Sequence, residues 1–233
     1  MAFKQFALDE HTTVTIYKRR TNRSLRLSIA ANGEARVTIP LWVPYKSGLD
    51  FARSRLDWIA SQQPVKAWLL TGQAVGKAHH LRFVADTTVT KVASRVRFNE
   101  VTVTHPAQLP TTDPDVQKLA KTASIRALRN QAEQLLPGRL QQLANQHGFH
   151  YRSVSIKQLK SRWGSCDQQH DIVLNLFLMQ LPWDCIDYVL LHELVHTEVL
   201  HHGPDFWQAM ERVLPSAKRL RKQLHGYQPV LGN

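Results

Sequence analysis

The hydrophobic pattern of this chain changes near residues 109–115, and this change limits the folds that are open to it. Before that segment, short β-branched stretches alternate with turn residues, as strands do. After it, apolar residues recur every three or four positions, as on one face of a helix. We therefore expect an α+β protein with two domains, a strand-rich domain over residues 1–112 and a second domain over residues 113–233.

Five strands and one helix are expected in the first domain. Asn32-Gly33 predicts a tight hairpin turn, because both residues tolerate the positive φ that a two-residue turn requires. Apolar residues at helical spacing predict a helix over residues 47–63, which ends before a proline. The expected strands are residues 12–17, 25–29, 35–39, 81–84 and 101–104.

The second domain begins with a long helical pattern that contains Pro137 and ends at Gly148. Because proline favours the first turn of a helix, we expect two helices here, with the second one starting at Pro137. The remaining pattern predicts strands over residues 154–156 and 172–178 around a polar turn at 164–169, a helix over 182–198, and another helix after Gly203-Pro204.

The composition limits the classes of molecule that this chain is expected to bind. The 233 residues carry a net charge of +12, and residues 1–112 contribute 16 basic against 7 acidic residues, so nucleic acid is a candidate partner. No apolar run is long enough to cross a membrane, and acidic residues interrupt the first residues before a signal peptide could form. Two cysteines in no paired motif, Cys166 and Cys185, are typical of reduced thiols. We expect a cytoplasmic protein with no membrane partner.

Residues 192–196 read His-Glu-Leu-Val-His, an H-E-x-x-H motif within the expected helix. Positions four apart lie on one face of a helix, so His192 and His196 can bind the same metal ion. Glu193 lies beside them, where a carboxylate can accept a proton from a water molecule activated by the metal. The motif predicts a hydrolytic metal site on a helix.

Catalytic zinc uses three protein ligands and leaves one position open. His202, ten positions after His192, is the candidate third ligand. An unbroken helix would carry it about 15 Å along the axis, so the helix has to end within residues 198–201. The Gly-Pro pair directly after His202 indicates such a turn. Two alternative third ligands remain, His201 and Glu211.

Four stretches, one of which runs into the H-E-x-x-H motif, resemble, in order, the YgjP-like family of metal-dependent hydrolases, which is related to the SprT-like zinc proteases. The resemblance is close over residues 113–233 and looser over the first domain. The stretches are Ser161-Arg162-Trp163-Gly164-Ser165-Cys166, Leu174-Asn175-Leu176, residues 186–196, and His202-Gly203-Pro204-Asp205-Phe206-Trp207.

The resemblance implies a zincin-like catalytic domain with one zinc ion. His192, His196 and His202 would be the zinc ligands, and Glu193 would be the general base. Three further residues near this region are candidates for contacting substrate: Arg162, Trp163 and Asn175. For Asn175, a polar residue in an apolar strand, hydrogen bonding to the backbone is the competing interpretation.

The function expected from these residues is a zinc-dependent hydrolase, with a metallopeptidase acting on proteins or peptides as the first hypothesis. A nucleoside triphosphate pyrophosphatase is an alternative, although no Gly-rich phosphate loop accompanies the motif. A DNA-guided protease would use the basic first domain to bind DNA. A non-catalytic nucleic-acid-binding protein with a structural zinc would normally need four protein ligands and no Glu193.

Overall fold

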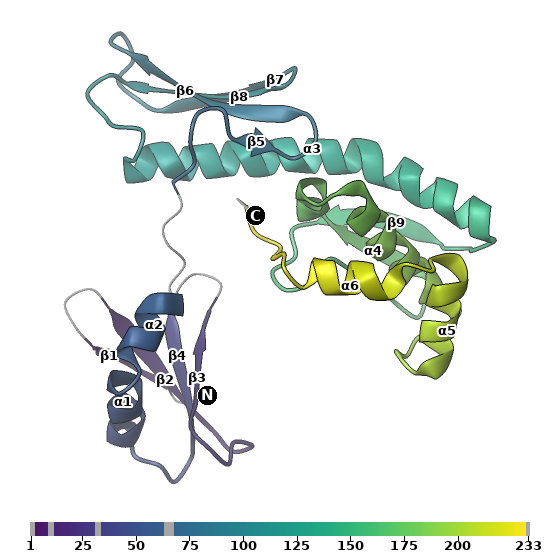
Figure 1. The fold of residues 1–233 in the computed structure, drawn as a ribbon. Helices are drawn as coiled ribbons and strands as arrows, with labels where there is room; N and C mark the ends of the chain where they lie inside the picture. Colours follow the sequence, from purple (N-terminus) through teal and green to yellow (C-terminus); the bar gives the residue numbers. More distant parts are fainter. Residues whose placement is uncertain (1–2, 9–11, 31–33, 63–67, 232–233) are drawn as a thin grey trace. The chain divides into compact units, whose positions relative to one another are not determined.

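The computed structural model describes residues 3–8, 12–30, 34–62 and 68–231 (Figure 1). The chain forms two compact units, residues 1–67 and residues 68–233. Both units combine sheets and helices, and helices dominate the C-terminal part, so the α+β expectation is confirmed. The expected Asn32-Gly33 turn lies outside the described residues.

The N-terminal unit is a four-stranded sheet with helices on one face. Its strands lie in the order β1-β2-β4-β3, with β2 parallel to β4 and both outer pairs antiparallel. Ile16 and Ile39 point from the sheet onto Gly48 of α1, where an added Cβ would lie 3.1 Å from each side chain. The elements are β1 (Phe3–Ala7), β2 (Thr13–Arg19), β3 (Arg26–Ile29), β4 (Ala35–Pro40), α1 (Tyr45–Arg53) and α2 (Leu56–Gln62).

The second unit begins with a sheet of the same topology, in the order β5-β6-β8-β7, again with a parallel central pair. This sheet packs on the long helix α3, which runs beneath it (Figure 1). The elements are β5 (Ala74–Val75), β6 (His79–Asp86), β7 (Ala93–Arg97), β8 (Glu100–Pro106) and α3 (Pro114–His147).

Helix α3 is one helix of 34 residues and continues through Pro137, so the expected division into two helices was wrong. Proline removes one backbone hydrogen bond and disfavours a helix interior by about 3 kcal/mol. Leu136 and Leu140, one on each side of the proline, are fully buried. Burial of the two side chains is worth roughly 1.5–3 kcal/mol each, which offsets the proline.

The structure divides the chain at residue 67 and not near residue 113. Leu81, Val101 and Val103 from the strands share one core with residues of α3. The polar segment at 109–115 that suggested a boundary instead leads into this helix, which begins at Pro114. The Asp113 carboxylate accepts hydrogen bonds from the backbone N–H groups of Asp115 and Val116, at 2.9 and 3.3 Å, as a helix N-cap does.

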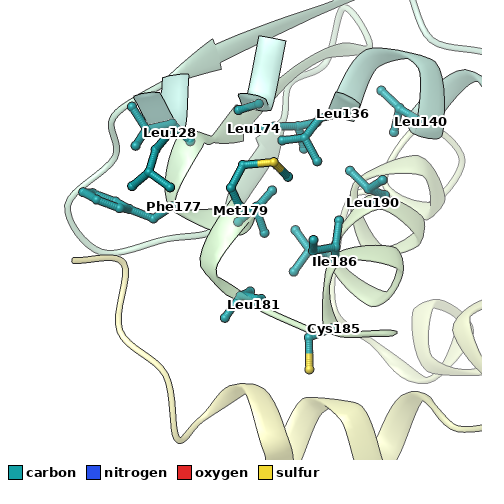
Figure 2. Packing of buried hydrophobic residues seen from close by; sticks show 14 of the residues in the cluster. Leu128, Leu136, Leu140, Leu174, Phe177, Met179, Leu181, Cys185, Ile186 and Leu190 are labelled. Carbon is teal, nitrogen blue, oxygen red and sulfur yellow. The ribbon is translucent and has the colours of Figure 1, made fainter. Parts of the chain in front are cut away.

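A second sheet, a 3₁₀ helix and three α-helices complete the described part of the unit. The sheet has the order β10-β11-β9, which leaves β10 at an edge. The expected strand over residues 172–178 ends at Asn175 and continues as a 3₁₀ helix, η1. Figure 2 shows η1 and α4 packed against α3 through Met179, Ile186 and Leu190. The elements are β9 (Ser153–Lys157), β10 (Gly164–Cys166), β11 (Asp171–Asn175), η1 (Leu176–Gln180), α4 (Trp183–Val195), α5 (Pro204–Val213) and α6 (Ala217–Leu224).

None of the described helices combines the length and the apolar character needed to cross a membrane.

Candidate metal centre

Helix α4 carries the H-E-x-x-H motif at its C-terminal end. Ile186, Val189 and Leu190 are buried in the core, which fixes the position and rotation of the helix. His192 and Glu193 lie in its last turn, and His196 is the residue directly after Val195, where the helix ends. The motif therefore begins on a rigid element and finishes at its C-cap.

The chain turns at this point, slightly earlier than the spacing predicted. The Thr197 hydroxyl donates to the Leu194 carbonyl at 2.7 Å, and the Val199 N–H donates to the Val195 carbonyl at 2.9 Å. These bonds close the end of the helix with an irregular turn. The turn brings His202, on the loop before α5, back toward the motif.

Three imidazole nitrogens converge at the end of α4. The Nε2 atoms of His192 and His202 lie 3.0 Å apart, those of His196 and His202 3.1 Å, and those of His192 and His196 3.2 Å. Two ligands about 2.05 Å from a tetrahedral zinc ion are roughly 3.3 Å apart. The three nitrogens therefore have the spacing of one face of a zinc coordination sphere.

The tautomer of His196 is fixed by the backbone. Its Nδ1 lies 3.0 Å from the carbonyl oxygen of Val199, and a carbonyl can only accept, so Nδ1 carries the proton. Nε2 then keeps its lone pair for a metal ion, as in many histidine ligands. His192 differs, because its Nδ1 is buried and has no hydrogen-bond partner among the described residues.

Aromatic side chains of α5 support all three imidazoles. The Phe206 ring is fully buried, and its centroid lies 4.9, 4.6 and 4.7 Å from the rings of His192, His196 and His202. Trp207 stacks on His202 with a centroid distance of 6.1 Å, and the guanidinium of Arg221 in α6 lies over the Trp207 ring, 4.4 Å from its centroid. These contacts orient His202.

Burial favours the neutral imidazoles that a metal requires. It lowers the pKa of His192 to about 3, with the neighbouring histidines adding to the effect. The pKa of His196 is also lowered, again mainly by burial. At neutral pH both rings therefore present free lone pairs, and binding a metal ion would displace few protons.

Glu193 is buried against the backbone of β10. Only 4% of its surface is exposed, and a Cβ added to Gly164 would lie 2.6 Å from its Oε1 atom. Burial raises the pKa of this carboxyl group to about 8, while the charge of Arg162 acts in the opposite direction. Such a pKa lies in the range that suits a general base or acid near neutral pH.

The three candidate substrate residues have different environments. Asn175 is fully buried, and its amide donates to the carbonyl oxygens of Leu159 and Arg162, at 2.9 and 2.8 Å. Both of its N–H bonds are thus used to shape the loop before β10. Trp163 is half-buried and packs against the core. Arg162 is exposed, and its charge reaches Glu193.

The described cluster of potential metal ligands consists of His192, His196 and His202. Neither alternative third ligand belongs to this cluster, neither His201 nor Glu211. Glu211 instead forms an exposed ion pair with Lys218 at 3.7 Å. Sequence reasoning did not find the contact between Gly164 and Glu193, or the contact of Phe206 with all three imidazoles. The glycine inside a short strand was the available signal, because it often marks a close approach.

Comparison with known proteins identifies the family of the chain. The YgjP-like metallopeptidase domain matches residues 23–227, and the chain belongs to this family of metal-dependent hydrolases. Comparison with curated proteins found no match. Among solved structures, the chain is similar to the metallopeptidase zymogen abylysin of Pyrococcus abyssi, with 24% identity and a TM-score of 0.36 over 40% of this chain and 93% of that one. The zymogen jannalysin of Methanocaldococcus jannaschii gives 15% identity and a TM-score of 0.34 over 44% and 94%.

Replacing Phe206 tests the support of the three imidazoles. Phe206→Ala is expected to lower the free energy of unfolding by about 3–5 kcal/mol through the cavity it creates. It should also weaken metal binding by roughly 10–100-fold, because the rings lose their common support. Denaturant unfolding and metal titration measure the two effects. Phe98→Ala is the control, since Phe98 is 94% exposed; equal behaviour of both variants would contradict this role.

Proposed function

We propose that this protein is a zinc-dependent peptidase with Glu193 as its general base. The observation that carries the proposal is the convergence of three Nε2 atoms within 3.2 Å of one another, next to a buried carboxyl group on the same helix. Three histidines leave one coordination position open, as catalytic zinc sites do. A purely structural site would not need Glu193.

Zinc fits this donor set better than a harder cation. Three neutral imidazoles without a carboxylate ligand suit zinc and other late transition metals, whereas magnesium and calcium prefer oxygen. When bound, the ion would supply a Lewis acid that polarises the scissile carbonyl and lowers the pKa of a water molecule and of the nearby carboxyl group. His192, His196 and His202 are the residues that would bind it.

Glu193 moves the proton in this proposal. Its carboxylate accepts a proton from the attacking water and later returns it to the leaving amine. The contact with Gly164 limits the positions of the carboxyl group, so the base is oriented before substrate arrives. Arg162 adds a positive charge that favours the ionised form of Glu193.

The edge strand β10 is the proposed binding site for the peptide. The Asn175 N–H donates to the Trp163 carbonyl at 2.9 Å, just before β10 begins. In an antiparallel ladder, hydrogen-bonded pairs alternate with non-hydrogen-bonded pairs, so the next residue, Gly164, directs its N–H and C=O groups away from β11. An extended peptide can pair with these groups. Because Gly164 contacts Glu193, this pairing would align a peptide bond beside the base.

The Glu193→Gln variant tests the proposed base. Gln cannot accept the proton, so cleavage of an unfolded protein should fall by about 10²–10⁴-fold while zinc remains bound. Peptide products from zinc-loaded wild type and variant are compared by mass spectrometry. The same mixture contains nucleoside triphosphates. Release of pyrophosphate that depends on Glu193, without peptide products, would contradict the peptidase and identify a phosphohydrolase.

The Gly164→Ala variant tests the contact between β10 and the base. The added methyl group would lie 2.6 Å from Glu193 Oε1, so the carboxyl group must move and activity should fall while zinc content stays unchanged. Gly138→Ala is the matched control, because nothing lies within 4 Å of a Cβ at that position of α3. Full peptidase activity in Gly164→Ala would contradict the proposed arrangement.

A further inference from the structure

The sheet of the N-terminal unit has one face that no described element of that unit covers. Along β2, Val14 and Ile16 are buried beneath α1. Successive side chains of a strand point to opposite faces, so Tyr17 and Arg19 both lie on the uncovered face. The same alternation places Phe3 of β1 there. On β3 and β4 it does so for four more residues: Arg26, Ser28, Arg36 and Thr38.

The strand register arranges these side chains in a row. Phe3 lies opposite Tyr17, Tyr17 opposite Thr38, and Thr38 opposite Arg26, so one row crosses all four strands. The rings of Phe3 and Tyr17 are neighbours at a centroid distance of 5.6 Å. Phe3 is 60% exposed. Aromatic rings therefore occupy one end of the row and a basic group the other.

Positive charge surrounds this row. A polar hollow of about 390 Å³ is lined by Tyr17, Thr38 and three arginines, Arg19, Arg26 and Arg36. Arg36 forms an ion pair with Glu34 at 2.9 Å. Arg19 and Arg26 are exposed and form no ion pair with the residues that the structure describes. Their charges are available to an anionic ligand.

We propose that this face binds single-stranded nucleic acid, with backbone phosphates on Arg19 and Arg26 and a base stacked on Phe3 and Tyr17. A basic surface with exposed aromatic rings is the arrangement that binds single strands, because every base has a face that can stack. Duplex DNA fits less well. In a duplex the bases are stacked on one another, so they offer no free face to Phe3 and Tyr17.

The proposal is independent of the peptidase, and its test measures binding alone. Fluorescence anisotropy of a labelled oligothymidylate of 20 nucleotides is recorded with the full-length protein over a range of salt concentrations. Arg19→Glu combined with Arg26→Glu should weaken binding by about tenfold or more and reduce the slope of log K against log salt by roughly 1.4, since each phosphate contact contributes about 0.7.

The matched control makes the same change of charge on the other face. Arg53 and Arg55 are both exposed, at the end of α1 and directly after it. Arg53→Glu combined with Arg55→Glu should leave the affinity within about twofold, if binding is local to the uncovered face. Circular dichroism verifies folding, and the milder pair Arg19→Gln and Arg26→Gln replaces the first variant if it unfolds.

The Tyr17→Leu variant tests the contribution of base stacking to binding separately from the contribution of charge. It should weaken binding of the oligonucleotide by about fivefold or more, because a stacking surface is lost, without changing the salt slope. The proposal is overturned if wild type does not bind, if both charge-reversal pairs weaken binding equally, or if polyglutamate or duplex DNA competes as well as the single strand. Equal competition by a free nucleoside triphosphate would identify a nucleotide site instead and would also overturn it.

Discussion

Three imidazole Nε2 atoms within 3.2 Å of one another are the constraint on which the second unit depends. When all three atoms carry lone pairs, as a metal ion requires, they repel one another without a cation between them, so packing has to bring the rings together and keep them there. The buried helix α4 supplies two rings, and the turn after it returns the third. Phe206 contacts all three. Much of the surrounding core therefore serves to position nitrogen atoms.

The carboxyl group beside these nitrogens is also held in place by packing. Glu193 is buried where a charged side chain would be unfavourable, and its pKa is raised by this burial. A cation and Arg162 are the groups that can offset this cost. The close contact with Gly164 places the same carboxyl group at the open edge of a sheet. The proposed base, metal ligands and peptide-binding strand thus share one small part of the second unit.

Local sequence patterns predicted most of the helices and strands. The wrong predictions concern features that depend on contacts between residues far apart in the sequence. The H-E-x-x-H spacing predicted a helix with both histidines on one face, and the Gly-Pro pair predicted the turn near His202. Pro137 locally favours a helix start, but burial of Leu136 and Leu140 keeps α3 continuous. The polar segment before α3 resembled a linker because its packing partners are far apart in sequence. The contact of Gly164 with Glu193 joins residues 29 positions apart, so a glycine in a short strand could indicate a close approach but no local pattern could identify its partner.

The most direct test of the account is the zinc content of the purified protein, measured by mass spectrometry after dialysis against a weak chelator. Wild type and His201→Ala should each retain about one zinc ion per chain, as expected for a catalytic site with three ligands. His202→Ala, at the neighbouring position, should lose most of the ion because one corner of the cluster is removed. Retention of zinc by His202→Ala, or its loss from His201→Ala, would contradict the assignment of the three histidines.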